Sequence, residues 1–320
     1  MSKDDKFLIT PSRCTSSLPS ELKGDRYVGE EKLDGSRYML YLGYDPYDRH
    51  KGNTLLSRRP SSIDGKFVDR TFQVPHITAE NYGLDGTVID GEVFLKDFRT
   101  TSSIISSNPA LAVQKQDDLG LLDYRVFDVP VFRGKDIRQR PLEERRRVLE
   151  EVVKRMENPN VVAIEQFFKD FEKWFLKFVN AGGEGIIIKD LELPYGCGWA
   201  KWKKSFDVSC IITGYKDGNG KYSGGIGSLT LSVIKDGKLL EVGYASGFDD
   251  TLRRKMEKNF KKKYIGKVID VFAQELSKGN RLRHPTFWRF RDDINAKDCT
   301  LEKLKDDFKK KPKNNRWKYE

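Results

Sequence analysis

Short runs of β-branched and aromatic residues, separated by Asp-Gly and other glycine turns, constrain the fold of this chain most strongly. Residues 26–45 (RYVGEEKLDGSRYMLYLGYD) predict two strands around a turn, and residues 83–95 (GLDGTVIDGEVFL) predict a strand beside two Asp-Gly turns. Residues 121–132 predict a strand that ends at Pro130. The apolar run 185–190 (GIIIKD) is too short for a helix and predicts a buried strand.

Helical patterns lie between these strands. Residues 141–157 (PLEERRRVLEEVVKRME) predict a helix, because Pro141 stands at the first turn and apolar residues recur at helical spacing. Residues 166–185 predict a second amphipathic helix that ends at the glycine pair 182–183. Residues 100–116 are rich in serine and then in alanine, and predict a loop followed by a short helix.

The texture of the sequence changes near residue 205. Beyond it, short strands are joined by Gly-Asn-Gly, Gly-Gly and Asp-Gly turns, which predicts a small, separate β-barrel or sandwich. A chain of 320 residues is also long enough for about two domains. We therefore expect one domain over residues 1–205 and a second over residues 206–320, with a basic C-terminal tail.

Positive charge is concentrated at the C-terminal end. The net charge is +11, of which residues 251–270 contribute eight Lys/Arg against two acids and residues 301–320 eight against four. Such runs are also typical of solvated surfaces, but two of them in one expected domain favour a polyanionic partner, with nucleic acid ahead of an anionic membrane.

Other classes of protein are disfavoured by the sequence. No stretch approaches the roughly 18 apolar residues of a membrane helix, and the start MSKDDKFLIT lacks the apolar region of a signal peptide. The four cysteines are far apart, and the three histidines are too scattered for a typical zinc site. We expect an intracellular, cytoplasmic protein that binds no membrane, and a monomer by default.

One set of residues points to covalent chemistry at a lysine. A lysine that attacks the α-phosphate of a nucleotide needs a means of losing its proton, cations around the phosphate, carboxylates for Mg²⁺ and a ring against the base. The sequence offers these in order: Lys32 with Arg37 around an Asp-Gly turn, Arg58, Glu92, Phe127, Glu184, and Lys201 with Lys203 on one strand face. Each alone is also typical of an exposed turn, a strand face or a core residue.

These segments resemble the motifs of the covalent nucleotidyltransferases, and most closely the ATP-dependent DNA ligases of small phage or viral type. The resemblance runs from about residue 26 to residue 293, through EEKLDGSR, LLSRRPSSIDGKF, VIDGEVF, YRVFDV, EGIIIKD, WAKWKKS and RHPTFWRFRDD. It implies an α+β fold, with an adenylation domain of antiparallel sheets followed by an oligonucleotide-binding (OB) barrel.

The resemblance also implies a role for each residue. Lys32 would take AMP, and Glu30 would read the adenine amino group. Arg37 and Arg58 would lie near the nucleotide, Phe127 on the adenine, and Lys201 and Lys203 on the α-phosphate. Glu92 and Glu184 would hold a metal, Glu92 near the ribose as well. Arg289 and Arg291, in the motif aligned least securely, are candidates for orienting pyrophosphate or for contacting DNA phosphates.

The implied activity is the sealing of nicks in duplex DNA, with ATP and Mg²⁺, or Mn²⁺ in its place. RNA ligases and mRNA-capping guanylyltransferases share the lysine motif and remain alternatives, as does a catalytically dead nucleic-acid-binding protein. The DNA-encircling N-terminal domain of larger ligases has no room before Lys32 in this sequence, so DNA contacts are expected from the two core domains and the basic C-terminal segments.

Overall fold

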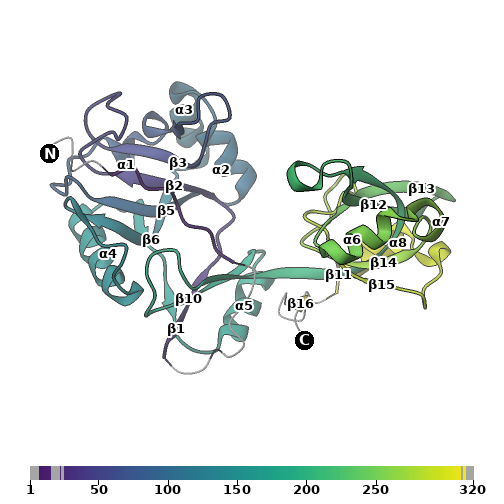
Figure 1. Cartoon of the computed structure of the whole chain (residues 1–320). Coiled ribbons are helices and arrows are strands. Elements are labelled where there is room, and N and C mark those ends of the chain that lie inside the picture. Colours follow the sequence, from purple (N-terminus) through teal and green to yellow (C-terminus); the bar gives the residue numbers. More distant parts are fainter. Residues whose placement is uncertain (1–6, 16–21, 23–24, 311–312, 315–320) are drawn as a thin grey trace. The chain divides into compact units, whose positions relative to one another are not determined.

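The structure, a computed structural model, describes residues 7–15, 22, 25–310 and 313–314. Internal contacts divide the chain into two compact units, Met1–Trp202 and Lys203–Glu320 (Figure 1). The division falls within the long strand β11 (Trp199–Asp217). Among the described residues, no helix is long and apolar enough to cross a membrane.

The first unit is built on a seven-stranded sheet. Its order is β4-β3-β2-β5-β6-β7, with β8 beside β6, and all neighbours are antiparallel except β6 and β8. The strands are β2 (Ser36–Tyr41), β3 (Thr54–Pro60), β4 (Phe67–Asp69), β5 (Val88–Phe94), β6 (Asp123–Phe132), β7 (Lys135–Asp136) and β8 (Val161–Ala163).

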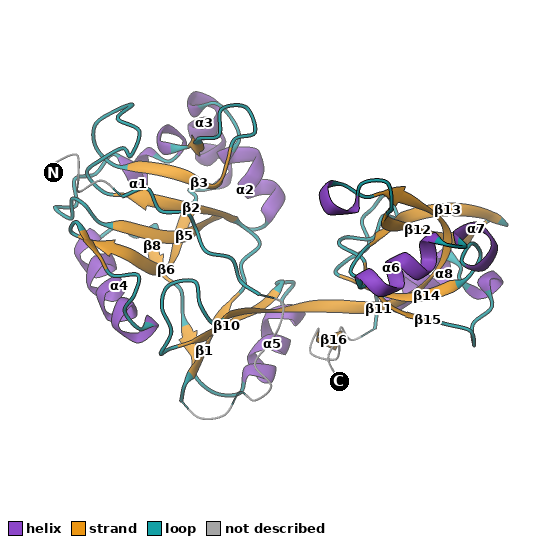
Figure 2. Cartoon of the chain, viewed as in Figure 1, coloured by secondary structure: helices purple, strands orange, loops and turns teal. Residues whose placement is uncertain are grey.

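Helices bury one hydrophobic core against this sheet. They are α1 (Pro75–Thr78), α2 (Phe98–Ile105), α3 (Pro109–Leu119) and α4 (Leu142–Met156), with the 3₁₀ turn η2 (Thr71–Gln73). Figure 2 shows α4 alongside β6 and β8, which it contacts. Leu149 of α4 and Ile104 of α2 are fully buried in the same cluster as Ile89 and Val126 of the sheet. Burial of this apolar surface is what holds the sheet and helices together.

A second, smaller sheet contains the strand that leads directly into Lys32. Its strands β9 (Gln166–Phe167), β1 (Tyr27–Glu31) and β10 (Gly185–Asp190) are antiparallel, and β11 follows β10. Helix α5 (Phe171–Asn180) contacts β10 and β1, and buries Phe175. A Cβ atom on Gly29 would lie 2.0 Å from the ring of Phe167, so only glycine allows this close packing of β1 on β9.

Three sequence predictions about this unit were wrong in detail. The strands around Asp34-Gly35 exist, but β1 and β2 belong to different sheets, so the segment between them connects the sheets and does not close a hairpin. Residues 100–105 are helical in α2, because Asp97 caps that helix through the backbone N–H of Thr100. Strand β6 continues past Pro130, which lies at a register shift where its missing N–H disturbs no regular ladder.

The predicted helix 166–185 was also too long at its start. Gln166 and Phe167 form β9, and α5 begins only at Phe171. The predicted helix 141–157 and the predicted buried strand 185–190 are confirmed as α4 and β10.

The second unit is a curled antiparallel sheet of five strands. The order β13-β12-β11-β14-β15 is formed by β11, β12 (Ile226–Lys235), β13 (Lys238–Ala245), β14 (Val268–Ala273) and β15 (Thr286–Phe290). The backbone N–H of Phe287 donates to the carbonyl of Ser246 (2.8 Å), which brings the two outer strands together and closes a small barrel. The β-barrel predicted beyond residue 205 is therefore confirmed.

Helices of the second unit lie between and after these strands. They are α6 (Asp250–Glu257), α7 (Phe260–Lys263) and α8 (Leu301–Asp307), with the 3₁₀ turns η3 (Gly220–Tyr222) and η4 (Ala296–Asp298). Met256, Phe260 and Leu304 bury their side chains in the barrel core. A short strand, β16 (Lys313–Asn314), pairs with β11. The last part of the predicted basic tail, residues 315–320, lies outside the described residues.

Candidate active site

Lys32 follows directly on β1 and faces a carboxylate that lies just before β10. Its backbone N–H donates to the carbonyl of Gly185 (3.0 Å), which fixes it beside the start of β10. Its ammonium forms an ion pair with Glu184, and the two side chains are only 18% and 10% exposed. Two residues predicted from separate segments are thus in contact. The Lys32 side chain is largely shielded from water but is still partly accessible to a ligand.

Glu92 adds a second carboxylate to this place. It lies on β5, and its Oε1 accepts a hydrogen bond from the backbone N–H of Gly35 (2.9 Å). Burial raises the pKa of Glu92 and the negative charge of Glu184 raises it further, while Lys32, the Gly35 N–H and Arg37 oppose the rise. A Cβ atom on Gly35 would lie 2.5 Å from the carbonyl oxygen of Val93, so glycine is required for this approach.

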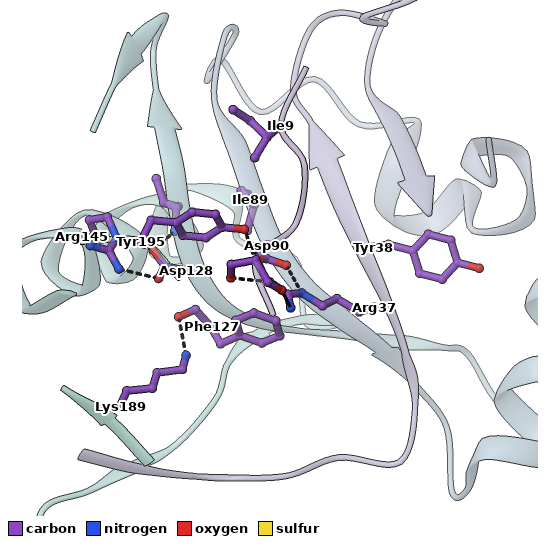
Figure 3. Close-up of polar contacts among 12 residues, drawn as sticks. Ile9, Arg37, Tyr38, Ile89, Asp90, Phe127, Asp128, Arg145, Lys189 and Tyr195 are labelled. Carbon is purple, nitrogen blue, oxygen red and sulfur yellow. Dashed lines mark hydrogen bonds and ion pairs between the residues drawn. The ribbon is translucent and has the colours of Figure 1, made fainter. Parts of the chain in front are cut away.

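Arg37 lies opposite Glu92 in the β2–β5 register and is held by a fully buried aspartate. Its guanidinium donates two hydrogen bonds to Asp90, at 2.8 and 2.5 Å, and one to the carbonyl of Ser12 at 2.6 Å. The hydroxyl of Tyr195 also donates to Asp90 (2.6 Å; Figure 3). Burial lowers the pKa of Arg37, but the charge of Asp90 outweighs it and the net pKa is raised. Arg37 is therefore a fixed cation.

Arg58, at the end of β3, extends this positive region. Burial lowers the pKa of Arg58, and the charges of Arg59, Arg37 and Arg13 lower it further, with Glu92 acting the other way. Arg58 is thus close enough to three other arginines for their charges to act on it, and such a positive region is suited to a multiply charged anion such as a phosphate chain. Arg13 was not a sequence prediction, because an isolated arginine near the N-terminus gives no motif.

Glu30 and Phe127 meet at a lysine that sequence reasoning missed. Glu30 is 2% exposed, and its carboxylate accepts from Lys189 Nζ (2.6 Å) and Gln166 Nε2 (2.7 Å). The Lys189 ammonium lies 4.7 Å from the ring centroid of Phe127 and 4.2 Å from that of Trp199. Figure 3 shows it beside the carbonyl of Phe127. The sequence signal that could have revealed Lys189 is a lysine near the end of the otherwise apolar strand GIIIKD.

A further buried ion pair supports the strand that carries Phe127. Asp128, the next residue on β6, accepts two hydrogen bonds from Arg145 of α4, at 2.8 and 2.9 Å, and both side chains are fully buried (Figure 3). Because neither charge is exposed to water, each depends on the other, and the pair fixes α4 against the site strand.

Lys201 and Lys203 lie on β11, on either side of the buried Trp202, whose ring stacks on that of Phe175 at 5.2 Å. Both lysines are partly buried, which agrees with the predicted shared strand face. Lys201 belongs to the first unit and Lys203 to the second. The backbone N–H of Lys201 donates to the carbonyl of Thr15 (3.0 Å).

Arg289 and Arg291 lie in the second unit and converge on one buried carboxylate. Both donate to Oδ2 of Asp270, at 2.9 and 2.7 Å, and Ser209 donates to its Oδ1 at 2.6 Å. Two hydrogen bonds raise the pKa of Arg291. The one to Asp293 has the larger effect, and the one to Asp270 has the next largest. Asp270 therefore holds the two arginines together at the end of the barrel strands.

The first unit also contains a cluster of a histidine and two acids. Asp45, His50 and Asp69 lie close enough together for one metal ion. Arg49 already donates to both oxygens of Asp45, at 2.8 and 3.0 Å, and lies 3.3 Å from Asp69. The guanidinium of Arg49 thus already compensates the charge of these acids.

Comparison with protein families covers both units. The family model for the ATP-dependent DNA ligase domain matches residues 10–205, and the model for the DNA ligase OB-like domain matches residues 217–291. The first match spans all the candidate residues of the first unit, from Glu30 to Lys201. The second spans Arg289 and Arg291.

Similar proteins and structures agree with these models. A DNA ligase of Methanocorpusculum labreanum is 29% identical over 87% of this chain, and one of Methanopyrus kandleri is 31% identical over 58%. The matched parts make up 54% and 38% of those proteins, so this chain spans about half or less of their length. A solved structure of a Lig E DNA ligase, described as binding DNA with a minimal scaffold, superimposes with a TM-score of 0.64 at 19% identity, over 89% of this chain and all of that one.

Proposed function

This chain belongs to the ATP-dependent DNA ligase family, and from that premise we propose that it seals nicks in duplex DNA through an AMP bound covalently to Lys32. The observation that carries the proposal is the meeting of Lys32, Glu184 and Glu92, from three separate motifs, beside the arginine cluster of Arg37 and Arg58. A nucleophile, carboxylates and phosphate-binding cations are the parts that the reaction needs.

The proposed reaction has three steps. The Lys32 ammonium gives a proton to the neighbouring Glu184 carboxylate, and its nitrogen forms a bond to the α-phosphorus of ATP. The bond from that phosphorus to the bridging oxygen breaks, and pyrophosphate leaves with that electron pair. An oxygen of the 5′-phosphate at the nick then attacks the same phosphorus, and the lysine leaves and regains a proton. Finally, the 3′-hydroxyl attacks the 5′-phosphate, AMP leaves, and the strand is joined.

The base would be read by Glu30 and would stack on Phe127. Arg37 and Arg58 would hold the nucleotide, and Lys201 and Lys203 its α-phosphate. We assign Arg289 and Arg291 to the leaving pyrophosphate, with DNA phosphates as the alternative. Their convergence on Asp270 supports a common role.

Glu92 and Glu184 would hold Mg²⁺, or Mn²⁺ in its place. The fit rests on their closeness, because the charge of Glu184 contributes to the raised pKa of Glu92, and a divalent cation would relieve this repulsion. When bound there, such an ion neutralises charge on the phosphate groups. The part of this chain is to offer two carboxylates and to keep them in place through Gly35 and Lys32.

Duplex DNA as partner is supported by the basic surface of the second unit. Lys255, Lys258, Lys261, Lys262 and Lys263 are exposed on and beside α6 and α7. The monomeric state and the cytoplasmic location expected from the sequence remain predictions.

The test is sealing of a 5′-labelled nicked DNA duplex with ATP and Mg²⁺. Parallel reactions replace the DNA strands by RNA, or ATP by GTP. Sealing of the DNA nick with ATP supports the proposal. Sealing of RNA alone, or covalent binding of GMP in place of AMP, would move the assignment to an RNA ligase or a capping guanylyltransferase.

A further inference from the structure

Three polar side chains form a row across the smaller sheet of the first unit. Glu30 of β1 is in register with Gln166 of β9, and Lys189 of β10 is in register with Val28, two residues from Glu30. In antiparallel sheets, paired residues and their diagonal neighbours share a face. The contacts agree, since Gln166 donates to Oε1 of Glu30 and Lys189 is paired with Oε2.

The charges in this row are almost completely enclosed. The side chains of Lys189 and Glu30 are each 2% exposed, and the ammonium lies against the rings of Trp199 and Phe127. A buried carboxylate needs a cation or strong hydrogen-bond donors to compensate its charge. Lys189 supplies a cation at one oxygen of Glu30 and Gln166 a donor at the other, so both oxygens are oriented.

The orientation of Glu30 determines which base it accepts. In its contacts with Lys189 and Gln166, both carboxylate oxygens act as acceptors. The amino group at position 6 of adenine donates to such an acceptor, whereas the carbonyl at that position of hypoxanthine or guanine is repelled. Lys189 also touches Phe127, the ring assigned to the base, so one ammonium adjoins both base-binding residues.

We propose that Lys189, assisted by Gln166, is a positioning residue that sets the preference for ATP by orienting both carboxylate oxygens of Glu30 as acceptors. The inference rests on the proposed function, because it takes Glu30 as the reader of the base. Both residues contact the side chains assigned to the base, so their effect is expected on the choice of nucleotide and on nucleotide binding.

The experiment measures nucleotidyl-lysine formation with ATP and with ITP, which carries a 6-carbonyl and lacks the 2-amino group of GTP. The ratio of the two rates at subsaturating nucleotide is compared between the wild type and Lys189→Met. We expect the preference for ATP to fall at least about tenfold, since a matched polar contact to a base is worth about 1–3 kcal/mol. Equal losses with both nucleotides, or an unchanged ratio, would overturn the inference.

Two further variants keep the test decisive. Lys189→Gln retains a donor without the charge, and replaces the methionine variant if thermal unfolding shows that the latter does not fold. It is expected to lose the preference as well, and a preserved ratio would contradict the role of charge. Glu30→Gln separates reading of the base by Glu30 from orientation of Glu30 by Lys189. If only this variant changes the ratio of the two rates, Glu30 reads the base but Lys189 does not set the preference for ATP. If the wild type forms no nucleotidyl-lysine with either nucleotide, the proposed function itself fails.

Discussion

The ammonium of Lys32 is paired with the carboxylate of Glu184, although the two residues come from distant segments of the chain. The pair places a carboxylate, the proposed proton acceptor and metal ligand, next to the proposed nucleophile. The two side chains meet because the backbone N–H of Lys32 is hydrogen-bonded to the carbonyl of Gly185, where β10 begins.

Replacement of Glu184 by glutamine is expected to lower the rate of AMP transfer to Lys32 by at least about a hundredfold, since a positioned acid or base contributes about 10²–10⁴-fold. The measurement is single-turnover labelling with α-labelled ATP. Glu172→Gln, an exposed acid on α5 of the same unit, is the matched control and should leave the rate unchanged. A Glu184 variant as fast as this control would contradict the role of the pair.

Glu92 makes the stability of the metal-free protein depend on pH. Its pKa is raised in the folded state, so the folded protein binds the proton more tightly than the unfolded chain does. The resulting stabilisation is present below the unfolded pKa and is lost as the pH rises through the folded pKa. Wild type should therefore lose stability relative to Glu92→Gln as the pH rises from about 4 through the mildly acidic range. Urea unfolding of both proteins, with EDTA, measures the difference, and Mg²⁺ should reduce it at neutral pH. A difference independent of pH would contradict this account.

Gly35→Ala tests the close approach that orients Glu92. The new methyl group would meet the carbonyl of Val93 at 2.5 Å, so the loop before β2 must move. Overpacking of this kind costs about 1–3 kcal/mol of unfolding free energy, and the shifted loop should also slow AMP transfer. Gly279→Ala is the control, because its nearest heavy atom in the second unit is 3.9 Å away. Equal stability and activity of both variants would show that Gly35 is not constrained.

The basic surface of α7 predicts a salt-dependent interaction with DNA. Changing Lys261, Lys262 and Lys263 together to glutamine should weaken binding to nicked duplex and lower the slope of log K against log salt by about 1–3, at about 0.9 for each phosphate that the variant no longer neutralises. Binding is measured by fluorescence anisotropy between 50 and 200 mM salt, roughly the range over which such effects are resolved. Three exposed lysines of the first unit, Lys135, Lys154 and Lys173, changed in the same way, are the control. An unchanged slope in the α7 variant would exclude this surface from the interface.

The fold class and the family could be predicted from the sequence because they depend on local patterns. Short strands, glycine turns and the order of the motifs are all visible in the chain, and the family models and the barrel topology confirm them. The segment after Lys32 could not be read in this way. Asp-Gly indicates a turn, but it does not show whether β1 and β2 pair with each other. In the structure β1 pairs with β10 and β2 pairs with β5, and both partners are distant in the sequence.

The residues that hold the site in place were harder to predict than those that would do the chemistry. Asp90, Tyr195 and Lys189 act through contacts with other side chains. Sheet register fixes the partners of Asp90 and Lys189, and the turn between β10 and β11 places Tyr195. Asp90 stood in the quoted motif VIDGEVF, yet only the structure shows that it is fully buried under Arg37. Buried ionisable residues in otherwise apolar strands are the sequence signal for such positions.

Covalent binding of AMP to Lys32 is tested by the mass of the labelled peptide. The wild-type protein is incubated with ATP and Mg²⁺, digested, and mapped by mass spectrometry, beside Lys32→Ala. We predict one AMP on the peptide that contains Lys32, and no AMP on any peptide of the variant. AMP on another lysine, or labelling that persists in Lys32→Ala, would contradict it.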